Sequence, residues 1–364
     1  MLSFSPSEEQ QMILTMVKQF ATDSIRKVYR DCDEKGEIPD NVIKTAWEMG
    51  LVSTGIPEDC GGGGGEHSAV TGTLLAEELA WGDLSIAMHV LSPALAAFPI
   101  LEMGTAEQKK KYLPTFCGSK FKAATAALME PRFDFDPNEL CVTAKAKDRS
   151  YVLNGVKCYV PLAADSDVIL VYAAENGSNQ GFIVEKGAKG LEIWEREKNM
   201  GIKALATYKL ALKDCKVPSE NRLGGEMGCD YNRLLNRSRV ALTAMAIGVA
   251  SASFEYARDY AKERVAFGEP IAARQAIAFM LAEMATEIDA TRLMNWEAAW
   301  KLDRGEDATR EASLTKLYGD DMVMMTTDRG VQILGGHGYI REHPVELWFR
   351  NGRGFAAFNG LAMV

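Results

Sequence analysis

The spacing of hydrophobic residues changes twice along the chain. Up to about residue 120 it follows short helices broken by loops, and from about residue 226 it returns to steps of three or four. Between these regions, apolar and polar residues alternate in short runs bounded by Gly, Asn and Asp, as in antiparallel strands. Helices, then strands, then helices predict an α+β chain with three domains: a helical domain over residues 1–120, a β domain over 121–225 and a helical bundle over 226–364.

The N-terminal region contains two helix beginnings and one clear break. Ser5 or Ser7 can cap a first helix over residues 10–27, because acidic residues that suit a first turn follow directly. A second helix is expected over residues 40–49. Five glycines then occupy residues 61–65. Such a run can cradle a phosphate, but no Lys-Ser/Thr follows it and no strand precedes it, so a plain flexible turn is the favoured interpretation.

The middle and C-terminal regions show the two spacings most clearly. Strand-like runs lie at residues 142–146, 151–157, 168–172 and 181–184. Further on, apolar residues define one face of a long helix: Val240, Ala244, Ile247, Ala250, Phe254, Ala257 and Ala261. The next helix repeats the spacing at Ile277, Leu281, Met284 and Ile288. Alanine-rich faces let long helices pack closely, which favours a bundle with these stripes in its core.

Composition narrows the class of protein without identifying it. Of the 364 residues, 47% are hydrophobic and 25% are charged, as in an ordinary soluble globular protein. The net charge of −9 argues against a nucleic-acid partner, and no apolar run approaches the roughly 20 residues that span a membrane. The seven Cys are scattered without a C-x-x-C pair, so we expect free thiols in a reducing compartment such as the cytoplasm, and no metal site.

Two motifs in the C-terminal region carry a resemblance to a known family. Arg264 begins the string RVAFGEP, which is followed by Gln275, and Gln332 begins the string QILGGHGY. They resemble the R-x-x-F-G-x-x-(x)4-Q and Q-x-x-G-G-x-G-Y signatures of acyl-CoA dehydrogenases, and the similarity extends over nearly the whole chain. The resemblance implies an N-terminal helical domain, a middle β-barrel and a C-terminal four-helix bundle. It also implies FAD as the cofactor and a tetramer built as a dimer of dimers.

By this resemblance, six residues would contact the diphosphate and adenine of an FAD held by a neighbouring chain: Arg264, Phe267, Gln275, Gln332, Gly335 and Gly336. A guanidinium suits a diphosphate because it offers a planar, permanently charged fork, and two successive glycines let the backbone approach a ligand closely. Without the flanking motifs, we would interpret the arginine as a surface charge and the glycines as a helix end. His89, His337 and His343 are isolated in the sequence and suggest neither a metal site nor a catalytic triad.

The other half of the family's flavin site is missing from the sequence. The closing motif of the family usually supplies a Glu as the base that removes the α-proton of an acyl thioester, and here Asn359 stands in its place. An amide has no useful basicity near neutral pH. Four further positions, where the resemblance leads us to expect Thr or Ser, hold Met129, Phe135, Pro161 and Leu361.

The second position at which members of the family carry a base is Ser238, and no neighbouring group in the sequence would activate it. Glu130 remains, but the resemblance implies a structural role for it. The chain also stops five residues after Asn359, where the family continues into a helix, so we expect this element to be missing or removed.

This one-sided loss favours a base-less subunit of an α2β2 acyl-CoA dehydrogenase, with a homologous catalytic subunit and an electron-transfer flavoprotein as partners. One alternative is a homotetramer with altered, non-Glu chemistry on an acyl-CoA, and another is a non-enzymatic scaffold. The acyl group stays open, with steroid, branched and aliphatic thioesters as candidates.

Overall fold

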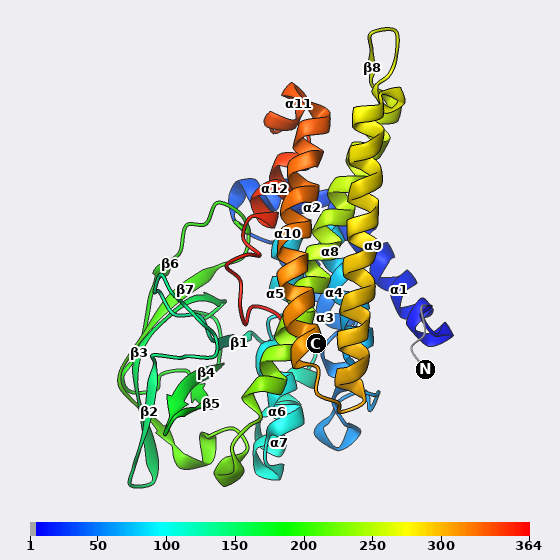
Figure 1. Ribbon diagram of the computed structural model, residues 1–364. Helices are drawn as coiled ribbons and strands as arrows, with labels where there is room; N and C mark the ends of the chain where they lie inside the picture. Colours follow the sequence, from blue (N-terminus) through cyan, green and yellow to red (C-terminus); the bar gives the residue numbers. More distant parts are fainter. Residues whose placement is uncertain (1–4) are drawn as a thin grey trace.

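The computed structural model describes residues 5–364 (Figure 1). Its N-terminal part contains seven α-helices: α1 (Glu8–Phe20), α2 (Arg26–Lys35), α3 (Asp40–Glu48), α4 (Ala69–Gly82), α5 (Leu84–Val90), α6 (Ala94–Met103) and α7 (Ala106–Tyr112). Ser7 caps α1, since its Oγ accepts the Gln10 N–H while the Gln10 side chain accepts the Ser7 N–H. The first helix was expected to end at Lys27, but a π-helical turn, Ala21–Ile25, carries the chain on into α2.

The glycine run at residues 61–65 forms an ordered turn. All five of its amide groups donate to backbone carbonyls within residues 53–58, over 2.8–3.1 Å. A Cβ on Gly62 would lie 2.1 Å from the Ile56 carbonyl oxygen, so only glycine fits there. Because these amides are already committed, the phosphate-cradle alternative is wrong. The plain turn is right, although it packs against the chain before it.

Seven strands form one sheet: β1 (Ala124–Ala127), β2 (Thr143–Lys147), β3 (Ser150–Pro161), β4 (Val168–Glu175), β5 (Ser178–Glu185), β6 (Leu191–Arg196) and β7 (Thr207–Pro218). Their order is β1-β4-β2-β3-β7-β6, with β5 also on β4. The expected barrel is therefore an open half-barrel. Most pairs are antiparallel as predicted, but β1 runs parallel to β4, and β2 meets β4 in parallel through the single pair Thr143–Ala174.

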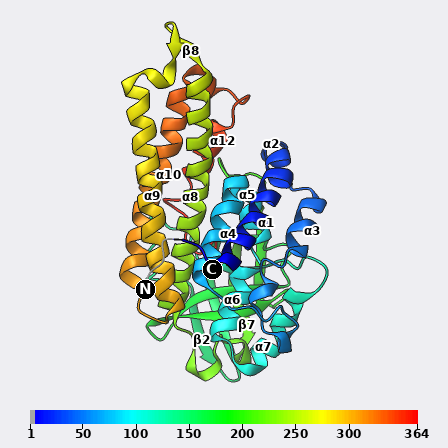
Figure 2. The ribbon, with the colours of Figure 1, turned by 90° about the vertical axis from the view of Figure 1, so that its right-hand side faces the viewer.

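The C-terminal part is built on three long helices: α8 (Tyr231–Glu263), α9 (Gln275–Asp303) and α10 (Thr309–Leu334). A small hairpin, β8 (Val265–Ala266) and β9 (Glu269–Pro270), joins α8 to α9, and the short helices α11 (Gly336–Tyr339) and α12 (Val345–Gly352) follow α10. α8 lies at the centre, against α4, α9 and α10 (Figure 2). α8 is apolar and long enough for a membrane span, but its most apolar window is 83% buried inside the protein, as in a core helix.

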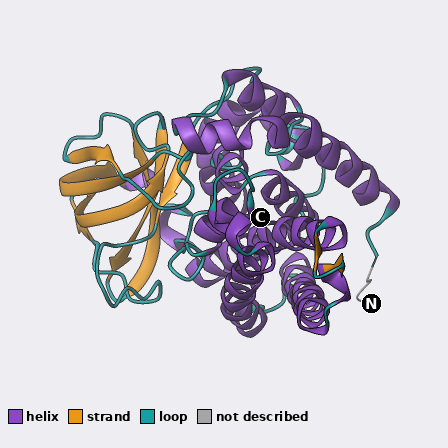
Figure 3. Ribbon diagram, turned by 90° about the horizontal axis from the view of Figure 1, so that it is seen from above, coloured by secondary structure: helices purple, strands orange, loops and turns teal. Residues whose placement is uncertain are grey.

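Small residues let α4 complete this bundle, as the alanine-rich faces predict. A Cβ on Gly248 of α8 would lie 2.2 Å from the Glu77 carbonyl of α4, which shows how closely the two backbones approach. The fourth member of the expected C-terminal bundle is thus supplied by the N-terminal part. The sheet lies to one side of the helices (Figure 3).

One ion cluster fastens α2 to the C-terminal part. The buried Asp33 carboxylate accepts two hydrogen bonds from Arg350 and one from Arg341, and the Lys203 ammonium lies 3.6 Å away. Burial would raise the pKa of Asp33, but the Arg350, Lys203 and Arg341 charges together hold it below its usual range.

Candidate functional site

A cavity of about 730 Å³ lies between the sheet and the segment that follows α12. Its wall comes from the loop after β1, the middle of β3, the loop after β6 and residues 356–359. Three of the positions that the sequence marked as altered, Met129, Phe135 and Asn359, meet on this wall. The other two, Pro161 and Leu361, are buried.

The cavity wall offers no base at the Asn359 position. Asn359 is half-buried, and its side-chain amide donates to the Ala357 carbonyl at 3.3 Å. Met129 and Phe135 add only apolar surface. At these three positions, a substrate or cofactor edge would meet a thioether, a phenyl ring and a neutral amide.

Glu130 is the most buried carboxylate on this wall, and its bonds commit it to the fold. It accepts the N–H groups of Cys141 and Val142, each at 2.8 Å, and the ammonium of Lys157 at 3.0 Å. Burial would raise the pKa of Glu130, but the Lys157 charge and the two amides hold it below its usual range. Burial lowers the pKa of Lys157 to about 8, so the pair is charged at neutral pH. Glu130 is therefore a structural anchor for the loop.

The second base position is equally inert. Ser238 lies on α8 with its side chain buried, and within residues 5–364 its Oγ has no hydrogen-bond partner. The adjacent Arg239 donates to Ser313 and Asn236. His89 packs on the ring of Phe121, and burial lowers its pKa to about 4. In residues 5–364, no hydrogen-bonded base therefore activates the Ser238 hydroxyl.

A second group of candidate residues gathers at the far end of the bundle, near the β8 and α11 labels in Figure 1. We name it the tip surface: Arg264, Phe267, Gln275, Gln332, Gly335 and Gly336. All six are exposed, and Phe267 is 94% exposed. In the described part of the chain, the Arg264 guanidinium and the Gln275 and Gln332 side chains form no hydrogen bond or ion pair. The structure thus brings all six to one end of the molecule and leaves the polar side chains of Arg264, Gln275 and Gln332 without a partner among residues 5–364.

No motif or periodic pattern in the sequence marks the rest of the cavity wall. Glu197, Lys198 and Lys209 also line it, and the Glu197 carboxylate accepts the Tyr159 N–H at 3.0 Å. Glu197 and Lys198 follow β6 in a loop, where charged residues are common and no periodic pattern marks them. Only the meeting of the sheet with residues 356–359 shows that they share a cavity.

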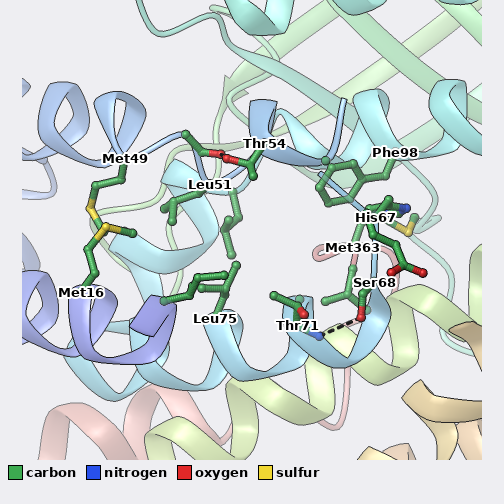
Figure 4. Close-up of a pocket in the computed structure, with 17 residues that line it drawn as sticks. Met16, Met49, Leu51, Thr54, His67, Ser68, Thr71, Leu75, Phe98 and Met363 are labelled. Carbon is green, nitrogen blue, oxygen red and sulfur yellow. Dashed lines mark hydrogen bonds between the residues drawn. The ribbon is translucent and has the colours of Figure 1, made fainter. Parts of the chain in front are cut away.

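A smaller cavity of about 130 Å³ lies between α1, α4 and α6 (Figure 4). Its wall is mostly apolar, with Met16, Leu75 and Phe98 among its members. On the same wall, His67 holds its Nδ1 3.3 Å from the Glu102 carboxylate. The cavity is too small for a dinucleotide, so we exclude it as the cofactor site.

Comparisons with known proteins match this fold along its whole length. The N-terminal, middle and C-terminal domains of acyl-CoA dehydrogenases match residues 7–120, 125–215 and 230–362. The chain belongs to the acyl-CoA dehydrogenase enzyme family. It is 34% identical to the caffeyl-CoA reductase–Etf complex subunit CarC of Acetobacterium woodii, over 98% of this chain and 96% of the relative. An acyl-CoA dehydrogenase of Bacillus subtilis is also 34% identical, over 97% and 95%. The structure of butyryl-CoA dehydrogenase from Megasphaera elsdenii superposes with a TM-score of 0.88 at 30% identity, covering 98% of this chain and 95% of that one.

FAD is the cofactor that goes with this acyl-CoA dehydrogenase fold, and the two groups of residues differ in how well they fit it. The tip surface suits a diphosphate, because Arg264 is uncommitted and the N-terminus of the long helix α9 has no side-chain cap. The cavity does not suit the polar edge of a flavin. Met129 and Phe135 cannot hydrogen-bond, and the Tyr159 amide is already bonded to Glu197.

Proposed function

We propose that this chain is a subunit of an FAD-dependent acyl-CoA dehydrogenase that lacks its own base and lends its tip surface to an FAD seated mainly in another chain. The observation that carries the proposal is the contrast between its two half-sites. The polar side chains of the tip surface have no partner within the described chain, whereas the cavity has Asn359, Met129 and Phe135 where a working site needs a base and hydrogen bonds.

The complex would contain this chain and a homologous catalytic chain in an α2β2 tetramer. Arg264 would bind the FAD diphosphate. Gln332 and the Gly335–Gly336 backbone would contact the nucleotide beside it. When bound, FAD supplies hydride acceptance from the β-carbon of the acyl thioester. A carboxylate of the catalytic chain would remove the α-proton, because neither Asn359 nor Ser238 can do so.

The relatives support the rest of the proposal. The similar Acetobacterium woodii protein is named as a subunit of a caffeyl-CoA reductase–Etf complex, and the Megasphaera elsdenii structure is a butyryl-CoA dehydrogenase. We therefore propose an acyl-CoA thioester as substrate and an electron-transfer flavoprotein as the redox partner. Seven free cysteines suit a cytoplasmic location.

One observation favours a second candidate, a homotetramer with altered chemistry. The cavity is still about 730 Å³, and Lys198, Lys209 and Glu197 line it. A cavity of this size with charged residues on its wall is typical of a ligand site, which a chain without its own FAD would not require. In that case each chain would both hold an FAD and lend its tip surface to a neighbour, and the reaction would not use a Glu base.

Flavin stoichiometry separates these candidates. The chain is expressed alone and together with a homologous chain that carries the Glu, and FAD is released and quantified. Two FAD per four chains in the mixed tetramer would support the proposal, whereas four in a tetramer of this chain alone would reject it. Arg264→Ala should deplete flavin from the mixed tetramer. Arg310→Ala is the matched control, because this exposed arginine lies at the opposite end of α10.

A further inference from the structure

The tip surface consists of two parts that are remote in sequence. The hairpin part, residues 264–275, connects α8 to α9, and the turn part, residues 332–336, ends α10. A single ligand can contact both parts only if their relative position is fixed. The hydrogen bonds that fix this relative position therefore contribute to ligand binding, although the residues that form them need not touch the ligand.

Few contacts within the turn part restrain its position. Gly335 has φ 59° and ψ −130°, a conformation that only glycine adopts readily, and a Cβ on Gly335 or Gly336 would meet no atom within 4 Å. Its local backbone bonds are Gly335 N–H to the Gln332 carbonyl at 3.1 Å and Gly338 N–H to the Gly335 carbonyl at 2.9 Å. These bonds close the turn but do not tie it to the hairpin part.

Tyr260, near the end of α8, bonds to both parts. Its carbonyl accepts the Arg264 N–H at 2.8 Å, at the start of the hairpin part. Its hydroxyl lies 2.7 Å from Nδ1 of His337, in the helical turn that directly follows Gly336. Between residues 335–343 and α8, only one other hydrogen bond occurs in the described chain, between the Tyr256 hydroxyl and Nδ1 of His343 at 2.8 Å.

The two histidines are isolated in the sequence, but the structure brings their rings together. The His337 and His343 rings lie 5.3 Å apart, each bonded to a tyrosine one helical turn from the other. The two histidines differ in their backbone contacts, because the Arg30 guanidinium donates a hydrogen bond to the His343 carbonyl at 3.0 Å. In the described residues, Tyr260 is the only side chain that hydrogen-bonds to the His337 ring.

We propose that the Tyr260–His337 hydrogen bond is a positioning device that sets the distance between Arg264 and the Gly335–Gly336 turn, so that both grip one diphosphate-bearing nucleotide. The proposal rests on the proposed function for the identity of that nucleotide, FAD. It holds equally for a mixed tetramer and for a homotetramer, because both use the tip surface. Loss of the bond lets the turn move, so ligand binding must then order it at a cost in free energy.

The test measures ADP binding to the full chain as purified, by calorimetry or NMR titration, because ADP carries the diphosphate and adenosine that the tip surface would hold. A hydrogen bond contributes about 1 kcal/mol, so Tyr260→Phe should weaken ADP binding about fivefold. Tyr256→Phe is the matched control. It removes the equivalent bond to His343, whose carbonyl stays on Arg30, and should leave ADP affinity within about twofold.

Variants of the histidine separate positioning from a general loss of stability. In His337→Asn, the side-chain amide can place either its oxygen or its NH2 group where Nδ1 lies, so it can still bond to the Tyr260 hydroxyl, and ADP affinity should be kept. His337→Ala should behave like Tyr260→Phe. Unchanged ADP affinity in Tyr260→Phe, with binding by the unaltered chain, would overturn the positioning role alone. No ADP binding by the unaltered chain would overturn the tip surface as a ligand site, and the proposed function with it.

Discussion

Glu130→Gln tests whether the buried carboxylate on the cavity wall is an anchor or an unrecognised base. Glu130 and Lys157 have side chains only 3% and 0% exposed, and they form an ion pair 3.0 Å long. The substitution keeps the size of the side chain but removes its charge. Lys157 then keeps the Leu128 carbonyl, at 2.8 Å, and the oxygen of the new amide as neutral partners, but it loses the carboxylate that neutralises its charge.

Removing one member of a buried ion pair costs about 3–5 kcal/mol, because the other charge stays uncompensated. The cost should be near the upper end of this range, since the Gln amide also places N–H groups against the Cys141 or Val142 N–H. At about 2 °C per kcal/mol, the melting temperature should fall by roughly 6–10 °C.

The measurement is thermal unfolding between pH 3.5 and 7.5. The control is Glu139→Gln, which makes the same substitution at an exposed position on the same loop. The folded-state pKa of Glu130 lies below its usual range, so its contribution is full above about pH 4.3 and is lost as the pH falls through the folded value. The gap in melting temperature should therefore narrow as the pH falls below about 4.3. A Glu130→Gln chain that melts like Glu139→Gln, yet abolishes turnover in the assembled enzyme, would make Glu130 the missing base.

Three further predictions follow from single sites. Asn359→Glu should give little dehydrogenase activity in this chain alone, since Met129 still denies the flavin edge a partner; strong activity would contradict the base-less assignment. Asp33→Asn should lower the free energy of unfolding by about 3–5 kcal/mol at neutral pH and by less below about pH 4. The reason is that Asp33 has a lowered pKa, so the stabilisation from its carboxylate is lost in acid, and urea unfolding at both pH values measures the difference. Gly338→Ala should destabilise the chain because its Cβ would lie 2.2 Å from the Val331 carbonyl, whereas Gly336→Ala should not, and melting curves compare the two.

The fold was predictable from the sequence where a period ran for long enough. The stripe from Val240 to Ala261 lies along one helix, α8, and the strand-like runs fall within β2 to β5. The open sheet was not predictable, because nothing local to β1 and β4 states that they pair in parallel. The first helix was placed too short, because a π-helical turn continues the same spacing into α2.

The site was predictable only as a set of motif positions. Their meeting depends on tertiary packing, which brings Asn359 and Met129 to one cavity and places the hairpin part and the turn part at the same end of the bundle. The Tyr260–His337 bond left no mark in the sequence, since a tyrosine on a helix and a histidine after a glycine pair are ordinary. Side-chain hydrogen bonds between remote segments carry no period, so they appear only once the helices are packed.

The two half-sites also differ in what they cost a chain without a flavin. Free polar groups on an exposed surface, such as Arg264 and Gln332, stay hydrated and cost the fold almost nothing. Polar groups on a half-enclosed cavity wall cost more, because an unbonded hydroxyl or carboxylate there is partly desolvated. Met129 and Phe135 remove that cost and add apolar contacts in its place. A chain that never seats a flavin is therefore more stable with this wall than with a catalytic one, while its tip surface can serve a neighbour's cofactor without a penalty to its own fold.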